Sequence, residues 1–147
     1  MTHVRTTIRH AMRDVIAAID PDWKVYASRK YARNVDPDQV LVDITVLNEN
    51  IEQETMDDER VRDASLYVRL QRVAPEEDID DLLDAHEVQI LAAIDGHDWS
   101  SLLEEDPELV QVNFSDDAEG GYVIAAIILR FDLEYRVGQF DPETVSA

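Results

Sequence analysis

The sequence predicts an α+β fold: an antiparallel or mixed sheet of four to five strands with two amphipathic helices packed on it, in the order α-β-β-β-α-β-β. Two periodicities predict it. In residues 2–19 and 75–96, apolar residues recur every three or four positions, which is the spacing of a helix that buries one side. In other segments apolar and polar residues alternate, which is typical of strands with one dry face.

The first predicted helix covers residues 2–19. Arg5, Arg9 and Arg13 recur at every fourth position and form a second stripe beside the apolar one. Asp20 ends this helix because it precedes Pro21, and a residue before proline avoids the helical conformation. The apolar stripe comprises Val4, Ile8, Met12, Val15 and Ile19.

The second predicted helix begins at Pro75 and stops at Gly96, two residues that favour these ends. The acids of residues 76–81 suit the positive end of the helix dipole, so this carboxylate cluster has a structural explanation. The buried stripe comprises Ile79, Leu82, Leu83, His86, Ile90 and Ile94.

Five strands are expected, at residues 23–27, 40–47, 61–73, 109–114 and 122–137. The acidic residues 48–59 read as the tip of a hairpin, and residues 115–121 as the turn of a second hairpin. Residues 1–137 thus form one α+β domain, and residues 138–147 are expected to be a flexible C-terminal tail.

The last strand would span roughly 50 Å at about 3.3 Å per residue, far more than a usual strand. Its first half, residues 122–129, carries no polar side chain except the Tyr122 hydroxyl, and its second half alternates strictly. The first half is therefore expected to be buried under the helices. The second half is expected to reach past them to a partner, with one charged face comprising Arg130, Asp132, Glu134 and Arg136.

The charge is the strongest feature of the composition. Thirteen basic and 33 acidic residues give a net charge of −20, and only Lys24 and Lys30 are lysines. High acidity with few lysines is typical of proteins from salt-loaded cytoplasms and indicates a halophilic, haloarchaeal source; an acidic protein of an ordinary cytoplasm is the alternative. Such a surface disfavours non-specific binding to nucleic acid.

The charge is also uneven along the chain. Residues 1–33 hold seven basic and three acidic residues, whereas the remaining 114 hold six and 30. A basic end and an acidic remainder suit a self-complementary, head-to-tail assembly. Neutralisation of these charges within one molecule is the alternative.

The sequence offers no arrangement typical of catalysis, of a cofactor or of a metal, and predicts that the protein is not an enzyme. There is no cysteine and no glycine-rich phosphate loop, and the four histidines lack metal-ligand spacing. His86 is expected to be a satisfied core or subunit-contact histidine rather than a ligand. No apolar run is long enough to span a membrane, and no secretory signal is recognisable at the N-terminus.

A basic loop follows the first short strand. It contains Arg29, Lys30, Tyr31 and Arg33. Cations beside an aromatic residue can contact nucleic acid, but the net charge favours docking to an acidic protein neighbour.

Taken together, residues 3–137 resemble the tail terminator proteins of long-tailed (siphovirus-type) viruses, of which the lambda tail terminator is the familiar member. The resemblance rests on the order of elements: the helix "HVRTTIRHAMRDVIAAI", the strand "PDQVLVDITVL", an acidic tip and the strand "ASLYVRLQRVA". The proline-initiated helix "PEEDIDDLLDAHEVQILAAI" and the strand "ILRFDLEYRV" follow. The acidity and the longer tip depart from the family pattern.

The resemblance implies a structural virion protein of the tail and neck, assembled in the host cytoplasm. Such proteins form a ring, typically a homohexamer, on the last ring of the tail tube. They end polymerisation of the tail tube protein and present a surface to the head–tail connector or neck protein, while genomic DNA passes through the lumen without specific binding. Two alternatives stay open: another neck component, such as a tail-completion or head–tail joining protein, and a small halophilic cytoplasmic α+β enzyme or binding domain.

Overall fold

A computed structural model describes residues 3–27, 39–52, 59–119, 122–138 and 141–145. It confirms the α+β class: two helices pack on a mixed sheet of six strands. The helices are α1 (Val4–Ala17) and α2 (Ile79–Asp95). The strands are β1 (Lys24–Tyr26), β2 (Val40–Glu52), β3 (Glu59–Pro75), β4 (Glu108–Glu119), β5 (Tyr122–Gly138) and β6 (Asp141–Val145).

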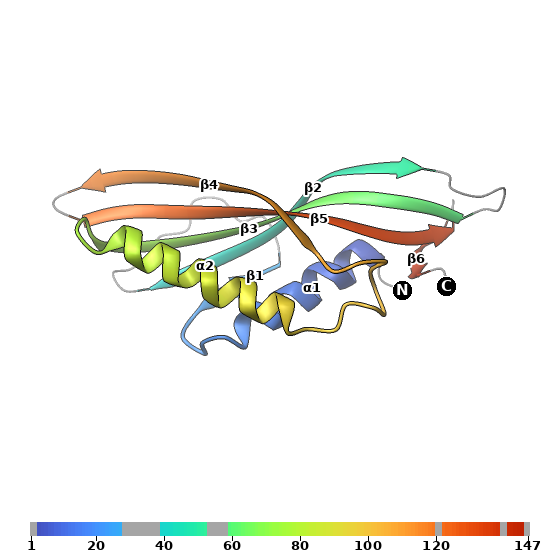
Figure 1. The fold of residues 1–147 in the computed structure, drawn as a ribbon, viewed down its shortest axis with the longest axis horizontal. Helices are drawn as coiled ribbons and strands as arrows, with labels where there is room; N and C mark the ends of the chain where they lie inside the picture. The colour runs from blue at the N-terminus through green and yellow to red at the C-terminus, as the bar shows by residue number, and fades with distance from the viewer. Residues whose placement is uncertain (1–2, 28–38, 53–58, 120–121, 139–140, 146–147) are drawn as a thin grey trace.

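The sheet has the strand order β1-β2-β3-β5-β4, with β6 paired to the far end of β5. β1 and β2 are parallel, and the other pairs are antiparallel. β3 and β5 pair in continuous register from Glu59 and Gly138 to Pro75 and Tyr122, so they form the spine of the sheet. Figure 1 shows a long, narrow molecule in which α2 runs beside the half of the sheet where β5 begins and α1 beside the other half.

One face of the sheet, called here the helix face, carries the core. Leu66, Val68 and Leu70 of β3 are fully buried, as are Ile127 and Leu129 of β5. The expected apolar stripe of α1 belongs to the same core through Val4, Ile8 and Met12, joined by Ile16, while Val15 and Ile19 are partly buried at its margin. The opposite face, called here the open face, carries the polar residues of the alternation.

A β-bulge in β2 changes which residues reach the helix face. Ile44 pairs with Val68 and Val46 with Leu66, but the register then shifts, so that Glu49 pairs with Ala64. Because side chains alternate, the extra residue, Leu47, moves the following odd-numbered residues to the helix face. The bulge thereby turns the Glu49 carboxylate toward α1.

The predicted tips are shorter than expected. β2 continues to Glu52 and β3 begins at Glu59, so much of the acidic segment of residues 48–59 is strand rather than loop. In the same way, β4 continues to Glu119 through residues expected to form a turn. These polar residues lack the alternation that marks a strand, and pairing with neighbouring strands holds them extended.

The end of the chain also differs from expectation. Residues 138–147 were expected to be a flexible tail, but Asp141–Val145 form β6, in which Val145 pairs with Val137. Pro75 is the last residue of β3, and α2 begins at Ile79, after a turn closed by a bond from the Asp78 N–H to the Pro75 carbonyl (3.0 Å). Proline suits the end of a strand, where its missing N–H costs no ladder bond.

The second half of β5 does not reach beyond its own fold. Phe131, Leu133, Tyr135 and Val137 are all at most 3% exposed. The apolar side of this half is thus covered within the molecule, and only its charged side remains for a partner. In the first half, Ile124 is 40% exposed, so that half is not fully buried either. Neither described helix is long and apolar enough to cross a bilayer.

Candidate partner-binding surfaces

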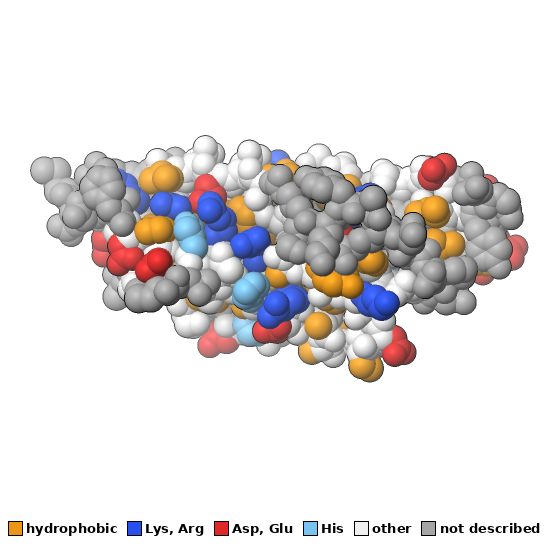
Figure 2. Space-filling view, turned by 180° about the vertical axis from the view of Figure 1, so that it is seen from behind, with side chains coloured by type: hydrophobic (Ala, Val, Ile, Leu, Met, Phe, Trp, Pro, Cys, Tyr) orange, Lys and Arg blue, Asp and Glu red, His pale blue; other side chains and the backbone are white. Residues whose placement is uncertain are grey.

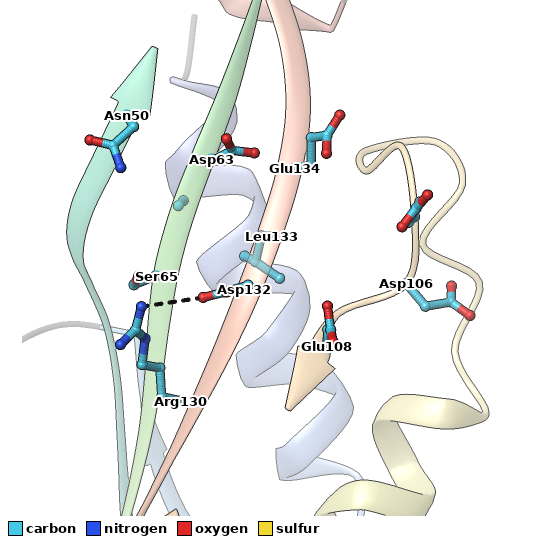
Figure 3. Close-up of a pocket in the computed structure, with 11 residues that line it drawn as sticks. Asn50, Asp63, Ser65, Asp106, Glu108, Arg130, Asp132, Leu133 and Glu134 are labelled. Carbon is cyan, nitrogen blue, oxygen red and sulfur yellow. Dashed lines mark ion pairs between the residues drawn. The ribbon is translucent and has the colours of Figure 1, made fainter. Parts of the chain in front are cut away.

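The open face carries a groove of about 330 Å³ where β3, β5 and the start of β4 meet the segment that precedes β4. Figure 3 shows its side chains in front of the strands, while the ribbon of α1 passes behind them. The groove and α1 therefore lie on opposite sides of the sheet. The lining residues are Asn50, Asp63, Ala64, Ser65, Glu105, Asp106, Glu108, Arg130, Asp132, Leu133 and Glu134.

The groove is strongly acidic. Six of its lining residues are carboxylic acids, and Arg130 is the one basic residue among the described residues that line it. An Arg130 Nη2 atom lies 3.6 Å from Asp132 Oδ1 (Figure 3), and both side chains are more than a third exposed. A pair so exposed contributes little to stability. Because six carboxylates face one arginine, the surface keeps an excess of negative charge.

Like charges face each other across the strands of the groove. Glu108 of β4 pairs with Asp132 of β5. Like charges directly opposite each other in an antiparallel pair destabilise the sheet. A cationic group from a partner would relieve this repulsion, which marks the groove as a candidate binding surface.

Three of the predicted interface residues therefore meet in one place: Arg130, Asp132 and Glu134. Arg136, the fourth on β5, is engaged within the molecule: its Nε lies 2.9 Å from Glu104 Oε1, and its Nη1 lies 3.9 Å from Glu59 Oε2. The other predicted interface residues lie outside the described residues; they are Arg29, Lys30, Tyr31 and Arg33.

A second cluster, which the sequence did not predict, lies on the helix face around Glu49. Its Oε2 accepts from Arg5 Nη1 of α1 at 2.8 Å and from Arg62 Nη1 of β3 at 3.3 Å. The Tyr135 hydroxyl of β5 donates to the other carboxylate oxygen. Burial, followed by the bond to Glu49, raises the pKa of Tyr135 well above its usual value, so its proton stays in place. The Glu49 cluster thus joins the start of α1 to three strands.

The outer side of α1 is basic. Figure 2 shows Lys, Arg and His side chains gathered in a band on the face seen from behind. The sequence of α1 includes His10 and three arginines, Arg5, Arg9 and Arg13. Among the described residues, Arg9 donates to Thr6 Oγ1 (3.0 Å) and to the Ala27 carbonyl (3.4 Å), neither of which is charged. Arg13 meets its neighbour Asp14 at 3.0 Å in an exposed pair. The charge of Arg5 is thus neutralised within the molecule by Glu49, whereas both hydrogen-bond acceptors of Arg9 are uncharged.

His86 of α2 is a satisfied core histidine, as expected. It is 6% exposed, accepts from Arg72 Nη1 at Nε2 (2.8 Å) and donates from Nδ1 to Gln89 Oε1 (2.9 Å). The His86 ring also packs edge-to-face against the Trp23 ring, with 5.1 Å between the ring centroids. Burial lowers the pKa of His86; Arg72 also lowers it, while the bond to Gln89 and the nearby Asp20 raise it.

Mild acid is expected to destabilise the protein through His86. Because its folded-state pKa lies below the unfolded value of about 6.5, the unfolded chain binds the proton more readily. The contribution of His86 is complete above about pH 6.5 and is lost as the pH falls through the folded pKa. Denaturant unfolding measures the free energy of unfolding at about pH 7.5 and at about pH 5.5. The decrease between the two pH values should be smaller for His86→Gln than for the wild type.

Two controls accompany this measurement. His10→Gln, at an exposed position of α1, should keep the wild-type loss. Burial also lowers the pKa of His3, so some loss remains in every variant. Equal losses in His86→Gln and the wild type would show that His86 does not cause the pH dependence.

Among the described residues, no group of three or more His, Asp or Glu is placed to hold a metal ion. A second hollow, of about 340 Å³, lies between the ends of α1 and α2 and is lined mainly by small apolar residues such as Ala18 and Ala92. Comparison with protein-family models gave no match, and comparison with curated proteins gave none either.

Proposed function

We propose that this chain is a structural protein of a tailed virus particle. It forms a ring that caps the tail tube, ends polymerisation of the tube protein and joins the tail to the neck. The observation that supports this function best is the acidic groove on the open face, which contains the interface residues Arg130, Asp132 and Glu134. A groove in which carboxylates lie opposite each other is stabilised when a cationic partner binds, which suits it to assembly.

The net charge of −20 supports the same role. A ring through which DNA passes must not bind the DNA, and acidic walls repel phosphate groups. In a host cytoplasm of high ionic strength, the repulsion between copies is screened to about 3 Å at 1 M salt, so acidic subunits can still assemble. The partners are then further copies in a ring, typically six in the tail terminator proteins that the sequence resembles, together with the tube protein and the neck protein.

The test is the length of tail tubes seen by electron microscopy in about 1 M salt, where the Debye length is about 3 Å. The tube protein is expressed with and without this chain. With it, short tubes of uniform length with a cap at one end are expected. Indefinitely long tubes with no bound cap would contradict the terminator role and favour a position on the head side of the neck, or no role in the particle.

A charge-reversal variant sharpens the test. Arg29→Glu with Lys30→Glu reverses the basic loop proposed to meet an acidic surface of the tube or an adjacent subunit. The variant should fold, as judged by circular dichroism, but should no longer limit tube length. Tubes of unchanged length would contradict a role of these two residues in capping.

A further inference from the structure

We propose that the outer side of α1, defined by Arg9, His10 and Arg13, docks into the acidic groove of a second copy of this chain. This inference rests on the self-assembly in the proposed function, but not on the virus, the tube or the neck. It names the two surfaces that meet.

The helix side of this contact is cationic and lacks strong partners. Arg9 has no carboxylate partner among the described residues, and its Nε is buried without a hydrogen bond. Arg13 has an exposed pair with its neighbour in sequence, which contributes little. Arg5, in contrast, is held by Glu49, so the arginines of the next two turns are the ones that remain for a partner.

The groove provides what these arginines lack. A guanidinium group presents several N–H donors in a planar fork that fits a carboxylate with two parallel bonds. The groove has six carboxylates, and two of them, those of Glu108 and Asp132, lie opposite each other on neighbouring strands. Its volume of about 330 Å³ leaves room for the ends of arginine side chains.

The geometry makes the partner a second molecule. α1 packs on the helix face, whereas the groove opens on the other side of the sheet (Figure 3), so one molecule cannot bring its own two surfaces together. A contact between two different surfaces repeats from copy to copy, and it closes into a ring or continues as a filament. The chain is therefore self-complementary despite its net charge.

Salt is expected to favour the contact at first. Two copies of charge −20 repel each other at long range, and this repulsion fades when the Debye length falls from about 8 Å at 0.15 M to about 3 Å at 1 M salt. Directly bonded arginine–carboxylate pairs are screened less. At about 1 M salt, the wild type should therefore form a species with a mass greater than the 16.8 kDa of the monomer.

The experiment is a charge swap followed by analytical ultracentrifugation. The helix variant carries Arg9→Glu and Arg13→Glu. The groove variant carries Glu105→Lys, Asp106→Lys, Glu108→Lys and Asp132→Lys, all at exposed positions. Each variant alone should associate at least about a hundredfold more weakly than the wild type, because like charges then meet across the contact. An equal mixture should associate again, because each acidic helix meets a basic groove and each basic helix an acidic groove.

Matched controls separate the contact from net charge. A variant with Asp84→Lys, Asp95→Lys, Asp116→Lys and Asp117→Lys has the same net charge as the groove variant, −12 in place of −20, at exposed positions away from the groove. It should associate at least as well as the wild type. Since Arg9 is partly buried, the milder pair Arg9→Gln with Arg13→Gln serves if the helix variant does not fold.

Three outcomes would overturn the inference: a wild type that stays monomeric at every salt concentration, variants that associate like the wild type, and a mixture that stays dissociated. A wild type that is monomeric but still shortens tubes would refute this contact and leave the terminator role standing. Assembly through these surfaces without any effect on tube length would support this contact and refute the terminator role.

Discussion

Glu49→Ala is expected to lower the free energy of unfolding by about 3 to 5 kcal/mol, which is typical of removing one partner from a buried ion pair. The Glu49 side chain is 9% exposed and the Arg62 side chain 13%. Without the carboxylate, Arg62 remains a nearly buried cation and the Tyr135 hydroxyl loses its acceptor. Arg5 can turn toward water, since its side chain is 40% exposed. Chemical denaturation at constant pH and salt measures the loss.

The matched control is Glu104→Ala. Glu104 meets Arg136 at 2.9 Å, close to the 2.8 Å between Glu49 and Arg5, but its side chain is 36% exposed. Glu104→Ala should lower the free energy of unfolding by at most about 1 kcal/mol. A triple variant, Glu49→Met with Arg62→Leu and Tyr135→Phe, should recover much of the stability, since the one charge left without its partner, that of Arg5, can reach water. Equal losses for Glu49→Ala and Glu104→Ala would show that burial does not strengthen the Glu49 cluster.

Phe131→Ala is expected to cost about 3 to 5 kcal/mol by leaving a cavity in the core. Phe131 is 1% exposed and lies in the middle of β5, where it pairs with Leu66 on one side and Leu109 on the other. Phe114→Ala is the control: the same side chain on β4 is 60% exposed. Its expected change is within about 0.5 kcal/mol.

Thermal unfolding gives a second measurement of this pair. Each kcal/mol should shift the midpoint by about 2 to 4 °C in a chain of this size, so only Phe131→Ala should show a large shift. A large loss for Phe114→Ala in the isolated chain would mean that its ring is covered in solution, as it would be in an assembly. If an assembly covers the ring, the unfolding midpoint should rise with protein concentration, so the measurement is repeated at several concentrations.

The sequence predicted the elements whose side chains carry a clear period. The stripes of both helices and the alternation in β3 and β5 are each set by one buried side, and they appear in the structure nearly as expected. The added lengths of β2 and β4 were missed because their polar ends show no period. β6 was missed because its residues, "DPETV", include a proline and only one large apolar side chain.

The candidate surfaces were predictable only in part. The alternation of Arg130, Asp132 and Glu134 showed a charged strand face, but Glu105 and Asp106 join it from a connecting segment whose path no pattern reveals. The Glu49 cluster depends on the bulge at Leu47 and on a contact with Tyr135, 86 positions further along the chain. A carboxylate inside an acidic polar segment gives no sign of such a contact.

The pairing of β3 with β5 has a consequence for the order in which the protein is made. Pro75 pairs with Tyr122 and Glu59 with Gly138, so the spine joins residues 47 to 79 positions apart. On the ribosome, α1, β2 and β3 emerge well before β5, and until then Leu66, Val68 and Leu70 lack the strand that completes their face of the sheet. Pairings this distant form slowly, and incomplete sheets with open edges aggregate. A nascent chain of this protein therefore carries an unfinished apolar surface from the synthesis of β3 until that of β5, which is the situation that chaperones protect.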